Sequence, residues 1–149
     1  MFVATGFGIG LLPGAPGTCG ALFGAGIWWL VLAQAPLAVQ LASAGALIVA
    51  GTWLLRRLCA RHALGDDPAI VLDEMAGVCL TLACLPSDVL AMTAGFVLFR
   101  LFDILKPWPV SWADRNVRGG LGVMLDDVLA GVLAAITGHL ALWLLGAAG

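Results

Sequence analysis

No charged side chain occurs in this chain before Arg56. Hydrophobic residues make up 62% of the sequence, charged residues make up 11%, and the mean hydropathy is +1.05. The core of a soluble protein does not use this much apolar surface, so we expect the excess to face lipid. The sequence therefore predicts an integral membrane protein.

Long apolar runs predict the helices of this protein, over residues 21–35, 37–55, 69–85, 89–105 and 123–145. Pro36 and Pro86 fall in the turns between neighbouring runs, where proline cannot continue a helix. We therefore expect one all-α domain over residues 1–149. It should be a membrane bundle of about five helices, preceded by a Gly/Pro-rich N-terminal loop.

The N-terminal loop is predicted over residues 6–20, where glycine and proline interrupt the apolar sequence. A glycine-rich loop that ends in Thr18, just before a helix, offers free N–H groups of the kind that bind phosphate. A plain re-entrant or interfacial loop is the alternative. The run at 21–35 is shorter than the roughly 20 residues that cross a bilayer. The first helix is therefore expected either to tilt or to begin as early as Thr18.

The densest basic cluster, Arg56, Arg57 and Arg61, follows the second apolar run. Basic residues mark the cytoplasmic end of a membrane span, so the N-terminal loop and the polar link at 61–68 are expected on the cytoplasmic side. Most later charged residues then reach the same face, and only Asp88 falls on the other. This topology predicts a single site at the cytoplasmic interface.

Composition excludes several other classes of function. The formal net charge of -2 and the pI near 5.4 provide no basic surface for nucleic acid. The four cysteines form no CxxC pair and have no histidines at zinc-ligand spacing, so we expect them to be small buried side chains. The first residues lack the basic region of a signal peptide, so we expect the N-terminus to be retained.

Residues 99–127 hold four of the nine acidic and four of the seven basic residues. Ionisable groups near a bilayer are costly and therefore indicate function. The candidate acidic side chains come from three helix ends: Asp73, Glu74, Asp103, Asp126 and Asp127. They would repel one another without a cation, and Mg²⁺ prefers oxygen ligands. In each adjacent pair, one acid is expected to ligate and the other to brace a neighbour.

Basic residues on the same face suit phosphate, and the chain offers Lys106, Arg115 and Arg118 there. Acids, bases and a metal together favour phosphoryl chemistry. Simpler interpretations remain open: Arg100 and Asp103 can pair along one helix, and Trp108 can be an interfacial anchor. The sequence contains no Cys-x5-Arg, Asp-x-Asp or Ser-Gly-His motif, so a metal-activated water is the simplest route to hydrolysis.

Five segments, in order, resemble the phosphatidylglycerophosphatase A family of bacterial lipid phosphatases. They are Gly6-Phe-Gly-x-Gly with Pro16-Gly-Thr-x-Gly20, Ile70-Val-x-Asp-Glu-x-x-Gly77, Phe99-Arg-x-x-Asp-x-x-Lys-Pro-Trp-Pro109, Asp114-Arg-Asn116, and Gly119-Gly-x-Gly-x-Met-x-Asp-Asp-x-x-Ala-Gly131. The resemblance covers nearly the whole chain. It implies magnesium-dependent hydrolysis of phosphatidylglycerophosphate to phosphatidylglycerol and phosphate, by a multi-pass protein of the bacterial inner membrane with its active site at the cytoplasmic face.

The one-sided charge cluster, together with the resemblance, gives expected roles for individual residues. The expected catalytic residues are Asp73, Asp103, Lys106, Arg115 and Asp127. The expected substrate-binding residues are Thr18, Lys106, Trp108, Arg115 and Arg118. The expected Mg²⁺ ligands are Asp73, Glu74, Asp126 and Asp127.

Other functions fit parts of the sequence. A small ion or metal transporter would also place carboxylates in membrane helices, but it needs polar groups at the bilayer midplane or on both faces. A non-catalytic membrane assembly subunit is a further alternative. A phosphotransferase that uses CDP-diacylglycerol would carry a Gly-x3-Asp-x3-Asp ending, which this sequence lacks.

Overall fold

The computed structural model describes residues 2–62 and 69–146. Across these residues the chain forms six α-helices and no strand: α1 (Pro16–Ile27), α2 (Leu37–His62), α3 (Leu72–Ala83), α4 (Val89–Leu105), α5 (Val110–Asn116) and α6 (Gly120–Leu144). A π-helical turn over Trp28–Leu32 extends α1. The predicted all-α class is confirmed. The short helix α5 is additional to the five expected, and part of the polar link, residues 63–68, lies outside the described residues.

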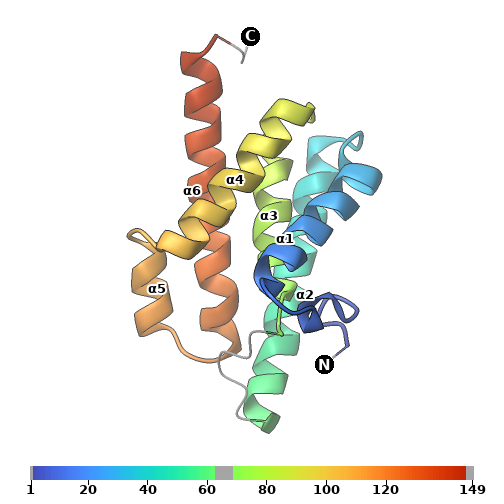
Figure 1. Ribbon diagram of the computed structural model, residues 1–149, viewed down its shortest axis with the longest axis vertical. Coiled ribbons are helices and arrows are strands. Elements are labelled where there is room, and N and C mark those ends of the chain that lie inside the picture. Colours follow the sequence, from blue (N-terminus) through green and yellow to red (C-terminus); the bar gives the residue numbers. More distant parts are fainter. Residues whose placement is uncertain (1, 63–68, 147–149) are drawn as a thin grey trace.

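Helix α3 is the central element, and α1, α2, α4 and α6 all pack against it (Figure 1). Ten of its twelve residues are buried. Its first turn carries Asp73 and Glu74, so the packing that buries α3 also fixes these two acids at the centre of one end of the bundle.

Small residues allow α3 and α6 to pack closely. A Cβ atom on Gly131 would lie 2.6 Å from the carbonyl oxygen of Gly77, and one on Gly77 would lie 2.7 Å from the carbonyl oxygen of Asp127. The buried hydroxyl of Thr81 lies 3.0 Å from Gly77 O and 3.2 Å from Gly131 O, and so links the two helices. Small residues at this contact let the two helix backbones approach closely.

The N-terminal segment packs against the chain that leads into α3. The backbone N–H of Val71 donates to the carbonyl oxygen of Ala4 at 2.9 Å, and Gly10 lies so close to Ala69 that a side chain there would overlap it. The prediction of a loop through residue 20 is wrong at its end, because α1 already begins at Pro16. Proline is well suited to this first helical position. Thr18 therefore lies in the first turn of α1, as one of the two sequence alternatives allowed.

The bounds of α4 agree with the predicted helix at 89–105 because its ends have clear local signals. The Asp88 side chain accepts a hydrogen bond from the N–H of Ala91 and caps the start. Lys106 adopts a left-handed conformation (φ 45°) and ends the helix before two prolines. The helix predicted at 69–85 is shorter, at Leu72–Ala83, and the last helix begins three residues earlier than predicted.

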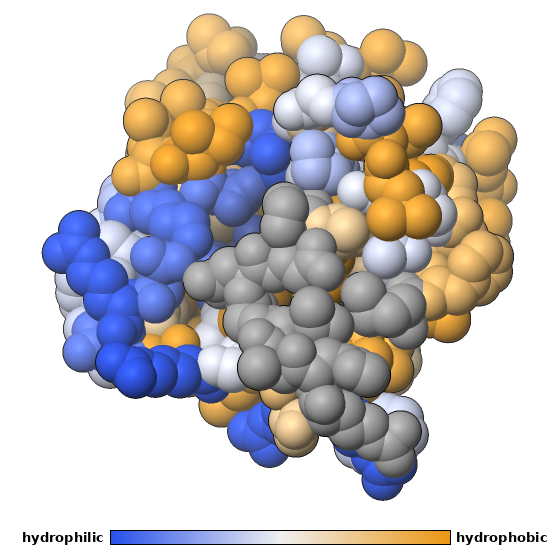
Figure 2. Space-filling model, turned by 60° about the horizontal axis from the view of Figure 1, so that its bottom comes forward, coloured by the Kyte–Doolittle hydropathy of each residue, from blue (hydrophilic) through white to orange (hydrophobic). Residues whose placement is uncertain are grey.

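Two helices are long and apolar enough to cross a membrane: residues Leu37–Ala60 of α2 and all of α6. Large apolar side chains are exposed on several helices, among them Leu30, Val49, Trp53, Leu90, Ile136 and Leu144. Figure 2 views the end at which α6 begins and shows hydrophilic residues gathered on one side of it, with hydrophobic residues around much of the rest. The polar side chains are therefore segregated on the surface.

Candidate active site

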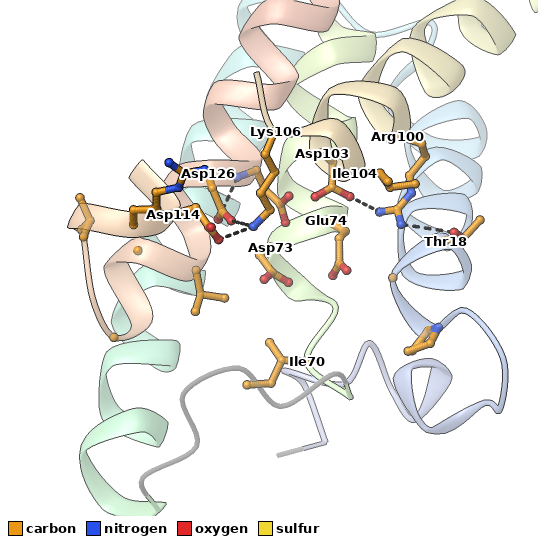
Figure 3. A pocket seen from close by; sticks show the side chains of 18 of the residues that line it. Thr18, Ile70, Asp73, Glu74, Arg100, Asp103, Ile104, Lys106, Asp114 and Asp126 are labelled. Carbon is orange, nitrogen blue, oxygen red and sulfur yellow. Dashed lines mark hydrogen bonds and ion pairs between the residues drawn. The ribbon is translucent and has the colours of Figure 1, made fainter. Parts of the chain in front are cut away.

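A pocket of about 770 Å³ lies at this end of the bundle, between the starts of α1, α3 and α6, the end of α4, and α5 (Figure 3). The sequence-predicted residues that line it are Thr18, Asp73, Glu74, Asp103, Lys106, Arg115, Arg118, Asp126 and Asp127. Trp108 is the exception: it is 79% exposed and does not line the pocket. The structure thus brings together side chains that are up to about 110 positions apart in the sequence.

Three of the acids form a compact group that we call the acid triad: Asp73, Glu74 and Asp127. One carboxylate oxygen from each lies within 4.8 Å of the others. Asp73 and Asp127 are only 7% and 4% exposed, and Asp73 Oδ1 and Glu74 Oε2 are buried with no hydrogen-bond partner among the described residues. Buried carboxylates without partners are costly, and several oxygen ligands converging on one point suit a hard cation such as Mg²⁺. The triad therefore fits a magnesium ion.

Asp126, the fourth predicted metal ligand, does not join this group. Its Oδ2 atom accepts a hydrogen bond from Lys106 Nζ at 2.8 Å, and its Oδ1 atom accepts one from the N–H of Asp127 at 3.1 Å. Successive side chains on a helix point about 100° apart. Asp127 consequently faces α3, while Asp126 faces the end of α4.

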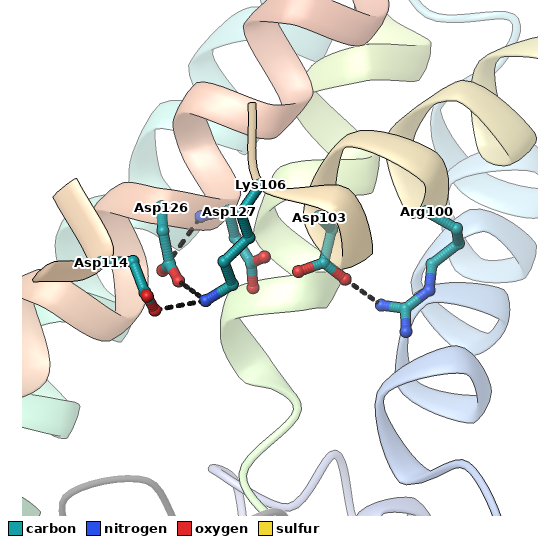
Figure 4. Close-up of polar contacts among 6 residues, drawn as sticks. All are labelled: Arg100, Asp103, Lys106, Asp114, Asp126 and Asp127. Carbon is teal, nitrogen blue, oxygen red and sulfur yellow. Dashed lines mark hydrogen bonds and ion pairs between the residues drawn. The ribbon is translucent and has the colours of Figure 1, made fainter. Parts of the chain in front are cut away.

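Lys106 links three elements of the site, as Figure 4 shows. From the end of α4, its ammonium group contacts Asp114 on α5 and Asp126 on α6. Partial burial alone would lower the pKa of Lys106, but hydrogen bonds and the charges of Asp114 and Asp126 outweigh this and raise the pKa above its ordinary value. Lys106 is therefore positively charged at neutral pH.

Arg100 also lines the pocket, although the sequence suggested only that it pairs with Asp103. That pair is present within α4, and Arg100 Nη2 also lies 3.3 Å from Thr18 Oγ on α1. The signal that could have identified Arg100 is its position one helical turn from Asp103 in an otherwise apolar helix. Asp114 belongs to one of the motifs that carry the resemblance, but it received no predicted role, because its contact with Lys106 depends on where α5 packs.

Gly17 is a further pocket residue that sequence reasoning did not single out. A side chain at this position would overlap the Glu74 carboxylate and press on Arg100. Glycine therefore allows the start of α1 to lie directly against the acid triad. The backbone N–H groups at a helix start carry partial positive charge, so this contact places favourable charge next to Glu74.

Arg115 and Arg118 are exposed at the pocket and form no salt bridge with any described residue. Their guanidinium groups are thus available to an anion, whereas Lys106 and Arg100 already contact acids. Fold and pocket together define a helical protein whose site combines converging carboxylates with several cations. Such a donor set suits an enzyme that acts on an anionic ester.

The sequence comparisons agree with this class. The family model described as Phosphatidylglycerophosphatase A matches residues 2–142. The chain belongs to the phosphatidylglycerophosphatase A family and is a phosphoric monoester hydrolase.

Similar proteins support the family assignment across most of the chain. The chain is 43% identical over 136 residues to Phosphatidylglycerophosphatase A of Escherichia coli (strain K12), covering 89% of this chain and 77% of that protein. It is 38% identical over 135 residues to Phosphatidylglycerophosphatase A of Haemophilus influenzae, covering 90% and 83%. A Bacteroides thetaiotaomicron protein, provisionally named phosphatidylinositol-3-phosphatase, is 41% identical over 154 residues, covering 98% and 95%. No solved structure matches the chain.

Proposed function

We propose that this protein is a magnesium-dependent phosphatidylglycerophosphatase, which hydrolyses phosphatidylglycerophosphate to phosphatidylglycerol and phosphate. Family membership supports the reaction. The observation that carries the metal dependence is the acid triad, whose carboxylate oxygens converge within 4.8 Å in a pocket lined by basic side chains.

In this proposal Asp73, Glu74 and Asp127 hold Mg²⁺. When bound, the ion supplies positive charge against the phosphate oxygens and acts as a Lewis acid. Arg115, which has no acidic partner among the described residues, binds the phosphate as a forked donor. The Lys106 ammonium has three N–H donors, and Asp114 and Asp126 take two of them, so one remains for phosphate.

In the same proposal, Asp103 orients and deprotonates the attacking water. One of its oxygens, Oδ2, is held by Arg100, which fixes the carboxylate, while the other oxygen remains for the water at the pocket. The water oxygen bonds to phosphorus as the bond between phosphorus and the terminal glycerol oxygen breaks. Asp103 receives a proton from the water and returns it to the leaving glycerol oxygen, which departs as the alcohol.

We further propose that the protein lies in the bacterial inner membrane with this pocket at the cytoplasmic face. The apolar helices α2 and α6 support membrane insertion. The exposed Arg56 and Arg57, near the end of α2, support a cytoplasmic position for that end. A transporter is not favoured, because the acids in the pocket gather at one end of the bundle. Asp88, toward the other end, serves as a helix cap.

The direct test is phosphate release from phosphatidylglycerophosphate by the purified protein, with Mg²⁺ varied and with EDTA. We expect EDTA to abolish turnover and added Mg²⁺ to restore it. Asp127→Asn should lower kcat/KM by about a hundredfold or more, because it removes a ligand that is 4% exposed. Asp88→Asn is the matched control, since it removes a charge at the other end of α4 and keeps a good helix cap.

Undiminished turnover in EDTA would contradict the metal role. Equal losses in Asp127→Asn and Asp88→Asn would contradict the assignment of the acid triad. Because one relative carries a phosphatidylinositol-3-phosphatase name, the same assay should include phosphatidylinositol 3-phosphate. Faster phosphate release from phosphatidylinositol 3-phosphate would make that lipid the substrate in place of phosphatidylglycerophosphate. The proposed metal centre would be unaffected.

A further inference from the structure

The start of α1 and the end of α4 form one side of the pocket. The polar contact between them is the 3.3 Å approach of Arg100 Nη2 to Thr18 Oγ. Beside it lies Ile104, which lines the pocket and is nevertheless 68% exposed. Figure 3 shows Thr18, Arg100 and Ile104 together on this side of the site. Ile104 therefore presents an exposed apolar side chain at the edge of the charged pocket.

An exposed apolar stripe along α4 leads to this edge. Leu90, Val97, Leu101 and Ile104 are all exposed, and their spacing of seven, four and three places them along one side of the helix. In a bilayer this stripe faces lipid. An acyl chain that lies along the stripe therefore brings its head group to the Arg100 side of the pocket.

The cations of the site lie on two sides of the acids. Figure 4 shows Arg100 at one side and Lys106 at the other, with Asp103 and Asp127 between them. Lys106 contacts α5, which carries Arg115. The pocket thus offers positive charge at two places, which suits a ligand with two separated phosphate groups.

We propose that phosphatidylglycerophosphate enters sideways between α1 and α4, and that Arg100 and Thr18 bind its bridging phosphodiester while the terminal phosphate lies at the acid triad. This inference rests on the proposed function. The substrate carries one phosphate next to its acyl chains and another at the end of its head group. The diester must therefore lie on the side by which the acyl chains enter, and the cation on that side is Arg100.

The hydrogen bonds of Arg100 leave it able to bind an anion. Its Nη1 group donates to Asp103, but the contact of Nη2 with Thr18 is at the long end of the hydrogen-bond range. A guanidinium group has five N–H donors, and a diester oxygen is a stronger acceptor than a hydroxyl. Thr18 can then donate its own hydroxyl proton to the same phosphate.

The entry route is tested with two neighbouring substitutions on α4. Ile104→Glu and Leu105→Glu change residues that are 68% and 67% exposed, but only Ile104 lines the pocket. Initial rates are measured on long-chain phosphatidylglycerophosphate in vesicles and on the deacylated, water-soluble head group. We expect Ile104→Glu to lower kcat/KM about tenfold or more on the vesicles and less than threefold on the soluble compound, with Leu105→Glu close to wild type on both.

The diester site is tested by direct binding of the two products, each of which carries one phosphate. Calorimetry on detergent-solubilised protein in the presence of Mg²⁺ measures the affinity for two ligands. One is short-chain phosphatidylglycerol, which has only the diester, and the other is inorganic phosphate. Arg100→Gln should weaken the binding of phosphatidylglycerol about tenfold or more and the binding of phosphate less than threefold. Arg115→Gln should show the reverse preference.

If Arg100→Gln weakens the binding of both products equally, the diester site is overturned and Arg100 instead positions Asp103. Equal vesicle rates for Ile104→Glu and Leu105→Glu would overturn the entry route. Failure of the wild-type protein to release phosphate from either substrate would instead refute the proposed function. The failures of the two proposals are thus distinguishable.

Discussion

Gly77 provides a sharp test of how closely α3 and α6 must pack for the acid triad to form. A Cβ atom at this position would lie 2.6 Å from Phe99 Cε2 and 2.7 Å from the carbonyl oxygen of Asp127. Ordinary van der Waals contact begins near 3.4 Å, so Gly77→Ala forces the Asp127 carbonyl and the Phe99 ring to retreat by about 0.7 Å. The same displacement separates Asp73, one turn earlier on α3, from Asp127.

Two quantities should respond to Gly77→Ala. Overpacking of this kind costs about 1–3 kcal/mol of stability, which thermal unfolding in detergent measures. A ligand displaced by a sizeable fraction of an ångström should reduce activity by roughly ten- to a hundredfold. The Mg²⁺ concentration that gives half-maximal rate should rise as well, because the ligands of the ion are moved apart.

Gly45→Ala is the matched control. Gly45 lies in the interior of α2, and a Cβ atom there would have no heavy atom within 4 Å. The substitution should stabilise the helix by about 0.5–1 kcal/mol and leave activity unchanged. If Gly77→Ala behaves like Gly45→Ala in both stability and Mg²⁺ requirement, close contact between α3 and α6 does not hold the triad together.

Two further substitutions examine contacts around the pocket. Lys106→Met leaves Asp114 and Asp126 facing each other without their shared cation. It should lower the unfolding free energy by about 1–2 kcal/mol and weaken the hydrogen-exchange protection of α5. Lys106→Arg keeps the positive charge and should retain most of the stability and most of the protection. Unchanged exchange in α5 would show that this contact does not anchor the helix. Thr81→Val removes a buried hydroxyl that reaches carbonyl groups on α3 and α6, and should lower the unfolding free energy by about 1 kcal/mol. Thr93→Val, whose hydroxyl is exposed and bonds only within α4, should be nearly neutral in the same measurement, and equal losses would refute the α3–α6 link.

The helices were predictable where the local sequence carries clear start and stop signals. Asp88 and the prolines after Lys106 define α4, and its predicted bounds are those of the structure. The start of α1 was less clear. The glycines at 6–14 belong to turns and a short 3₁₀ helix (Ile9–Leu11), and Pro16 begins an α-helix, although both stretches share the same Gly/Pro-rich composition. Local composition alone did not separate them.

The sequence by itself determined the all-helical class. It also determined that nearly every predicted site residue lies at one end of the bundle, because the lengths of the apolar runs set the face at which each helix ends. Only the tertiary structure decided which acids meet. Asp126 and Asp127 are neighbours in sequence, yet one contacts Lys106 and the other joins Asp73 and Glu74. A helix turns each residue about 100° from the next, so the packing of α6 against α3 and α4 assigns their partners. Packing also placed Gly17 of α1 and Arg100 of α4 beside the acids, and it left Trp108 outside the pocket.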